Sequence, residues 1–240
     1  MGSERIHLFD TPLLVSRNMG LAVDQRAAKR VMDILISGIG IIITSPIMLI
    51  IAIAVKAYDR GPVFYFQDRL TLGGKPFKIC KFRSMCVDSE KNGARLASKH
   101  DSRITPVGHV LRNLHLDELP QLFNVFKGDM SLVGPRPERE SIMLEYEKEL
   151  PEFYYRLKVK AGLTGYAQVY GKYNTTPYDK LKLDLFYIEN YSFLLDIKLI
   201  FMTVKIFFQK EVSEGVDDRQ VNALKGSGKN AGVSENKTEE

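Results

Sequence analysis

Two adjacent carboxylates, Asp117 and Glu118, have the types and the spacing that best suit catalysis in this chain. They stand just before a segment whose apolar residues share one helical face. Pro120 fits the first turn of that helix, where a missing N–H costs nothing. Free N–H groups and the helix dipole favour negative charge there. Acidic first turns are also common in ordinary helices, so helix capping is the simplest interpretation of the pair taken alone.

Basic residues elsewhere in the chain give the pair a second interpretation. Arg136 lies in GPRP, where a proline on each side fixes the backbone and makes the arginine costly to reorient. A rigid guanidinium suits phosphate oxygens, and neighbouring carboxylates suit Mg²⁺, which prefers one or two carboxylates plus substrate phosphates. Each cation alone fits an ordinary surface charge. Together they predict a phosphate-binding site formed by Lys81, Arg83, Arg112 and Arg136.

Residues 106–126 are expected to form two short helices, which leaves a helix-turn-helix as an alternative. Its second helix would offer only Gln121, Asn124 and Lys127 to bases, and the two carboxylates would repel phosphates. The formal charge of +5 suits nucleic acid or an anionic membrane surface, but nucleic acid does not explain the apolar segment described next. No nucleic-acid partner is therefore expected, and salt-dependent DNA binding would contradict this expectation.

Residues 34–55 form a run of 22 residues without a charge. A helix needs about 20 apolar residues to cross the hydrocarbon core, so a spanning helix is the first interpretation. Ser45 and Pro46 lie in the middle of the run, where proline removes a backbone hydrogen bond and bends the helix. Basic residues flank both ends, so they give no orientation for a crossing and also fit a helix that returns to the same side. A buried core helix is a third alternative.

A second apolar stretch, residues 193–208, carries Asp196, Lys198 and Lys205. A broad apolar face with few charges fits either a helix lying in the membrane interface or a helix packed on the domain. Apolar helix faces of this kind would also permit a homodimer.

The remaining sequence predicts an α+β fold that is mostly helical. Residues rich in β-formers at 63–66 and 76–82 predict a small β-hairpin, and further helices are expected at 138–149 and 177–191. Only two cysteines are present, which argues against a disulfide scaffold.

The expected division of the chain follows from these segments. The last thirty residues are rich in Gly, Ser, Asn and charge and are expected to be disordered, because they cannot bury enough apolar surface to fold. The parts are an N-terminal extension (1–28), a membrane helix (29–58), a catalytic domain (59–210) and a disordered tail (211–240).

Eight blocks of sequence resemble the bacterial sugar transferase family, the monotopic polyprenyl-phosphate phosphoglycosyltransferases. In family order they are KRVMDILISG, TSP, GPVFYFQDR, GGKPFKICKFRSM, DSRITPVGHVLRN, LDELPQLFNVFKGDMSLVGPRP, VKAGLTGYAQVYGK and KLKLDLFYIENYS. The resemblance covers about residues 29–208, and the long block from LDELPQ to GPRP is its most specific part.

The resemblance implies transfer of a sugar 1-phosphate from a UDP-sugar, galactose or glucose, to undecaprenyl phosphate, with release of UMP. This would be the first membrane step of exopolysaccharide, capsule or glycoconjugate assembly. Asp117 would attack the sugar-linked phosphate, form a phospho-aspartyl intermediate and help to hold Mg²⁺, with Glu118 as the second acid. The implied substrate-binding residues are Lys81, Arg83, Arg112, Arg136 and Asp184.

The resemblance also implies a re-entrant membrane helix, broken at Ser45 and Pro46. The protein would then be monotopic in the bacterial inner membrane, with a cytoplasmic catalytic domain, interfacial amphipathic helices and the lipid bilayer as a partner. The alternative from another class is an inactive membrane-anchored scaffold or regulator of polysaccharide assembly. The intact acidic pair and Arg136 argue against it, because a scaffold has no need of them.

Overall fold

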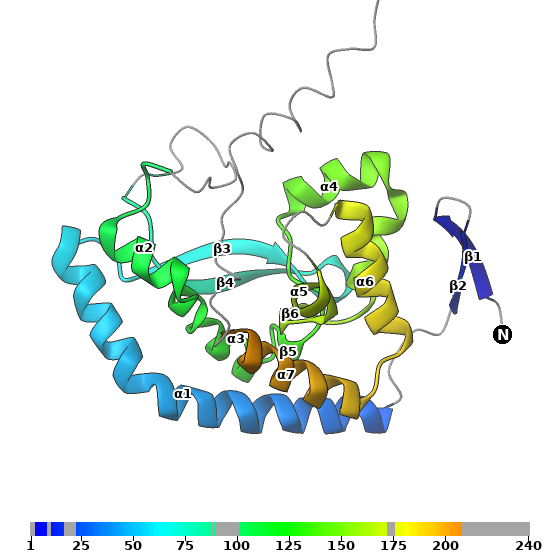
Figure 1. Ribbon diagram of the computed structural model, residues 1–240, viewed down its shortest axis with the longest axis horizontal. Coiled ribbons are helices and arrows are strands. Elements are labelled where there is room, and N and C mark those ends of the chain that lie inside the picture. Colours follow the sequence, from blue (N-terminus) through cyan, green and yellow to red (C-terminus); the bar gives the residue numbers. More distant parts are fainter. Residues whose placement is uncertain are drawn as a thin grey trace, which may run out of the picture.

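The computed structural model describes residues 3–8, 11–16, 23–87, 89, 101–171 and 176–207. Helices dominate these residues, which also form three separate two-stranded sheets (Figure 1). The elements in chain order are β1 (Ser3–Leu8), β2 (Thr11–Ser16), α1 (Val23–Asp59), β3 (Phe64–Leu70), η1 (Leu72–Gly74), β4 (Pro76–Phe82), α2 (Pro106–Asn113), η2 (Leu116–Glu118), α3 (Gln121–Lys127), β5 (Ser131–Val133), α4 (Glu140–Glu149), η3 (Pro151–Lys158), β6 (Gly162–Thr164), α5 (Tyr166–Tyr170), α6 (Pro177–Glu189) and α7 (Phe193–Phe207). The predicted tail, 211–240, lies outside the described residues.

Helix α1 is one bent helix whose two limbs pack on the same folded body (Figure 1). Near its start, the buried Asp33 accepts hydrogen bonds from β5, from Leu132 N at 2.9 Å and from Ser131 Oγ at 3.1 Å. Near its end, Met48 and Val55 join a buried apolar cluster that contains residues of β4 and α2. The helix begins at Val23, earlier than the predicted residue 29, and is long and apolar enough to cross a membrane.

The predicted break at Ser45 and Pro46 lies inside the continuous helix. Pro46 has no N–H to donate to the carbonyl of Ile42. The Ser45 hydroxyl donates to that carbonyl at 2.8 Å, and one residue earlier the Thr44 hydroxyl donates to Gly40 O at 2.7 Å. A helix tolerates a proline bend when a side chain satisfies the freed backbone carbonyl in this way.

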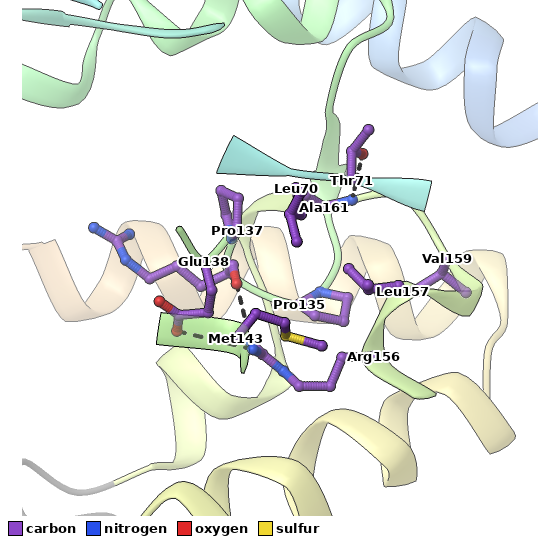
Figure 2. Close-up of a pocket in the computed structure, with 11 residues that line it drawn as sticks. Leu70, Thr71, Pro135, Pro137, Glu138, Met143, Arg156, Leu157, Val159 and Ala161 are labelled. Atoms are coloured by element: carbon purple, nitrogen blue, oxygen red, sulfur yellow. Dashed lines mark hydrogen bonds and ion pairs between the residues drawn. The ribbon is translucent and has the colours of Figure 1, made fainter. Parts of the chain in front are cut away.

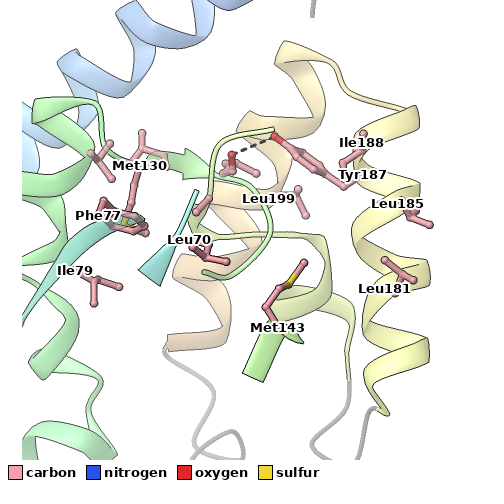
Figure 3. Packing of buried hydrophobic residues seen from close by; sticks show 14 of the residues in the cluster. Leu70, Phe77, Ile79, Met130, Met143, Leu181, Leu185, Tyr187, Ile188 and Leu199 are labelled. Carbon is pink, nitrogen blue, oxygen red and sulfur yellow. Dashed lines mark hydrogen bonds between the residues drawn. The ribbon is translucent and has the colours of Figure 1, made fainter. Parts of the chain in front are cut away.

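The core of the domain lies between the β3–β4 hairpin and helices α6 and α7. Hairpin residues Phe77 and Ile79 and helix residues Leu185 and Leu199 belong to one buried cluster (Figure 3). Each fully buried side chain of this size contributes about 1.5–3 kcal/mol relative to exposure. The antiparallel hairpin and helices α2, α3, α4, α6 and α7 agree with the sequence predictions.

Strands β5 and β6 form a parallel pair that the sequence did not predict. Each strand has only three residues, too short for an alternating pattern to be recognised. The two backbones approach so closely that a Cβ at Gly162 would lie 2.1 Å from Gly134 N. Glycine is therefore required at this crossing, which holds the loop that follows β5.

Candidate active site

The two adjacent carboxylates lie in η2, a single 3-10 turn between α2 and α3. The turn is preceded by His115 in the left-handed conformation, with φ 52°. Helix α3 begins only at Gln121, with Pro120 as its N-cap residue. The carboxylates therefore precede the helix rather than forming its first turn, and basic side chains rather than helix amides neutralise the charge of Glu118.

Glu118 is held by two cations from distant parts of the chain. Lys81, at the end of β4, donates to Glu118 Oε1 at 2.7 Å. Arg136, in the loop after β5, donates from Nη1 to Oε2 at 3.2 Å and from Nη2 to Oε1 in a shorter contact. Burial alone would raise the pKa of Glu118, but Arg136 and Lys81 outweigh it and hold the pKa far below its ordinary value. Glu118 is therefore an anion fixed in a bidentate clamp.

Asp117, the other carboxylate of the pair, lies in a different environment. No hydrogen bond or ion pair reaches its carboxylate from the part of the chain that the structure describes. Burial, and then the adjacent charge of Glu118, raise the pKa of Asp117 above its usual value. The positive charges of Lys81 and Arg112 act in the opposite direction. The pair thus combines one neutralised carboxylate with one carboxylate that is available to react or to bind a cation.

The arrangement fits a cation that is bound mainly by phosphate. Among the described residues there is no cluster of three or more His, Cys, Asp or Glu side chains that could hold a metal alone. Asp117 can supply one carboxylate, and Mg²⁺ commonly takes only one or two from the protein and the rest of its ligands from water and substrate phosphates. The side chain of Arg136 is 41% exposed, so it can meet a phosphate while it holds Glu118.

Two of the residues predicted to bind substrate lie away from this pair. Arg83 forms an ion pair with Asp59, at the last residue of α1, and its side chain is buried. Asp184 on α6 is 1% exposed and its Oδ2 lies 2.6 Å from Nε of Arg156. The structure therefore brings together Lys81, Arg112, Asp117, Glu118 and Arg136, but not Arg83 or Asp184.

A second charged cluster beside the GPRP loop was missed by the sequence analysis. Its centre is Glu138, whose carboxylate contacts Lys180 closely and lies 3.7 Å from Arg69 Nη1 and 3.8 Å from Arg156 Nη1. Figure 2 shows Arg156 reaching towards Glu138 and the loop that contains Pro135 and Pro137. The members come from β3, the loop, η3 and α6, so no local spacing in the sequence signals the cluster.

Comparison with known proteins identifies relatives along most of the chain. The family model described as bacterial sugar transferase matches residues 24–210. A UDP-N-acetylgalactosamine-undecaprenyl-phosphate N-acetylgalactosaminephosphotransferase of Aeromonas hydrophila is 46% identical over 180 residues, which cover 74% of this chain and 43% of that protein. A UDP-glucose:undecaprenyl-phosphate glucose-1-phosphate transferase of Klebsiella pneumoniae is 43% identical over 204 residues, covering 83% and 42%.

The chain spans less than half the length of these two relatives. A UDP-glucose:undecaprenyl-phosphate glucose-1-phosphate transferase of Caulobacter vibrioides is matched over more of its length, with 38% identity over 203 residues, 81% of this chain and 75% of that protein.

Proposed function

The chain belongs to the bacterial sugar transferase family, and from this premise we propose that it transfers a sugar 1-phosphate from a UDP-sugar to undecaprenyl phosphate. UMP and a diphosphate-linked lipid sugar are the products. The proposal extends to the whole chain the reaction named in its relatives, and the difference between the two carboxylates of the pair is the observation that carries it.

Asp117 is the proposed nucleophile because its carboxylate is unpartnered among the described residues while Glu118 is clamped. A carboxylate oxygen of Asp117 attacks the phosphorus that bears the sugar, and the bond from that phosphorus to the oxygen of UMP breaks. A terminal oxygen of undecaprenyl phosphate then attacks the same phosphorus and displaces Asp117. Splitting the transfer into two displacements predicts ping-pong kinetics.

Lys81, Arg112 and Arg136 stabilise the charge that the phosphates carry during both displacements. Phosphoryl transfer depends chiefly on positioning and charge neutralisation, which fixed guanidinium groups supply. Mg²⁺, bound by Asp117 and the diphosphate of the donor, would neutralise further charge there. Glu118 keeps Lys81 and Arg136 at a fixed separation through its two contacts, which prepares the site for an anionic substrate.

We propose that α1 enters the inner membrane from the cytoplasm and returns to the same side. Both of its ends are joined to one folded body, by the ion pair of Lys29 with Asp196 and by that of Asp59 with Arg83. A spanning helix would carry one end to the far side of the bilayer, away from that body. The apolar side chains on its outer face, Ile42 among them, are exposed and would contact lipid.

The transferred sugar has to be identified by direct assay, because relatives named for N-acetylgalactosamine and for glucose match this chain at similar identity. We would measure UMP release from three donors, UDP-N-acetylgalactosamine, UDP-glucose and UDP-galactose, each with undecaprenyl phosphate and Mg²⁺ and with the protein in lipid nanodiscs. Release of UMP with one donor is the expected result and identifies the sugar.

Two variants test the covalent step with a donor that is labelled in the sugar-linked phosphate. Without undecaprenyl phosphate, the native protein is expected to become labelled, Asp117→Asn to remain unlabelled, and the charge-matched control Asp68→Asn, an exposed residue of β3, to behave as native. No UMP release from folded protein with any donor would favour the scaffold. Release that survives Asp117→Asn would contradict the assignment of the nucleophile.

A further inference from the structure

The loop that carries Arg136 is held through its backbone carbonyls as well as through its prolines. Four consecutive carbonyls, of residues 135 to 138, each accept a hydrogen bond from another segment of the chain. The pairs are Pro135 O with Gly162 N at 2.9 Å, Arg136 O with Arg156 Nη2 at 2.9 Å, Pro137 O with Arg69 Nη1 at 3.0 Å, and Glu138 O with Leu70 N at 3.0 Å. The carbonyl of Arg136 itself depends on a single side chain, that of Arg156.

The guanidinium of Arg156 is fixed on every side. Its Nε donates to Asp184 Oδ2 at 2.6 Å, its Nη1 lies 3.8 Å from Glu138 Oε1, and its Nη2 donates to Arg136 O. The ring of Phe153 lies against its face, with the guanidinium carbon 4.6 Å from the ring centroid. Only 3% of the side chain is exposed, so Arg156 cannot reach a substrate and its orientation has little freedom.

The pair of Arg156 with Asp184 is difficult to explain by stability alone. Buried ion pairs contribute little compared with well-packed apolar residues of the same volume, because both charges lose their hydration. A guanidinium offers what an apolar side chain cannot, a rigid fork that joins Asp184 to the main chain of Arg136. The fork fixes the carbonyl of the residue whose own guanidinium clamps Glu118.

We propose that Arg156, oriented by Asp184, is a positioning residue that fixes the main chain of Arg136 and thereby aims its guanidinium at the donor phosphate. The proposal rests on the proposed function for its kinetic consequence, but the contact with the carbonyl can be tested without activity. Displacement of a catalytic group by about 1 Å can cost about 100-fold in rate. Neither Arg156 nor Asp184 touches the substrate in this scheme.

A double-mutant cycle separates positioning from a general structural role. Arg156→Lys keeps the charge beside Asp184 but loses the fork, and is expected to lower kcat/KM for the donor about 10- to 100-fold. In an Arg136→Lys background the same substitution should change kcat/KM less than about 2-fold, because the group it positions is already altered. Equal loss in both backgrounds would overturn the proposal.

A control and a second measurement complete the test. Lys180→Met removes the positive charge paired with Glu138 and leaves the contact of Arg156 with the carbonyl of Arg136 intact. Its fold-change in kcat/KM should therefore be the same in the native and the Arg136→Lys backgrounds. Hydrogen exchange of the 131–139 segment should become faster in Arg156→Lys, while that of residues 121–127 stays as in the native protein. Unchanged hydrogen exchange in the loop would overturn the positioning role, whether or not the protein is active. Absence of UMP release with every donor would instead be a failure of the proposed function alone.

Discussion

The buried contact between Lys29 and Asp196 makes a quantitative prediction about how α1 is attached. Lys29 Nζ donates to Asp196 Oδ2 at 2.5 Å and to Val133 O at 3.0 Å, and Tyr187 donates to Asp196 Oδ1 at 2.8 Å. Asp196 is fully buried. Lys29→Met removes the cation beside that carboxyl, while the Tyr187 hydroxyl still donates to it, and removal of one member of a buried pair costs about 3–5 kcal/mol.

The predicted loss is large enough to measure by thermal unfolding. For a folded region of about 150–250 residues, each kcal/mol lowers Tm by about 2–4 °C, so Lys29→Met should unfold about 6–20 °C below the native protein. The double variant Lys29→Met with Asp196→Asn removes both charges and keeps an oxygen acceptor for Tyr187, so its Tm should lie closer to native than that of Lys29→Met. The control is Lys198→Met, a substitution at an exposed residue of α7, the helix that carries Asp196. The Tm of this control should change by at most about 2 °C.

The assay is the unfolding temperature of each variant in nanodiscs of one lipid composition. A Tm for Lys29→Met within 2 °C of native would refute the reasoning, since it would mean that the carboxylate finds water or another partner. A double variant as unstable as Lys29→Met would also refute it, because packing rather than unpaired charge would then explain the loss.

Three further predictions concern other features of the fold. Because the pKa of Asp117 is raised and that of Glu118 is far below its usual value, kcat/KM for the UDP-sugar donor should fall with acidification through a single ionisation, that of Asp117. The pH profile from 5 to 8 tests this, and an acid limb with a slope of two would contradict it. Ser45→Ala leaves the carbonyl freed by Pro46 without its hydroxyl donor and should lower stability by about 1–3 kcal/mol in nanodiscs; an unchanged Tm would show that the hydroxyl does not matter. Gly162→Ala places a Cβ against backbone and should cost about 3 kcal/mol or more, whereas a Tm near native would mean that the β5–β6 crossing can open.

Local patterns in the sequence were enough to predict the elements that carry the site. The β-forming residues and turn residues around β3 and β4, and the apolar faces of α3 and α7, depend on neighbours within a few positions. The prolines that flank Arg136 also act locally, through the backbone. These signals led to the acidic pair and to the two cations, Lys81 and Arg136, that the structure places on Glu118.

The remaining features depend on contacts between distant residues and could not be predicted from spacing. Asp184 and Arg156 are 28 positions apart, and Lys29 and Asp196 are 167 apart. In the sequence, Lys29 cannot be distinguished from the other basic residues that flank the apolar run, because a buried lysine and a surface lysine look the same there. Its partner on α7 is what distinguishes them, and only the fold brings that partner near.

The attachment of both limbs of α1 to one body has a consequence for the lipid environment. An ordinary spanning helix adapts to a thicker or thinner bilayer by changing its tilt. A re-entrant α1 fixed at Lys29 and at Asp59 could not tilt independently of the domain, so the domain would set how deeply the bend reaches. The protein should then respond to the composition of the leaflet that it enters and be largely indifferent to total bilayer thickness.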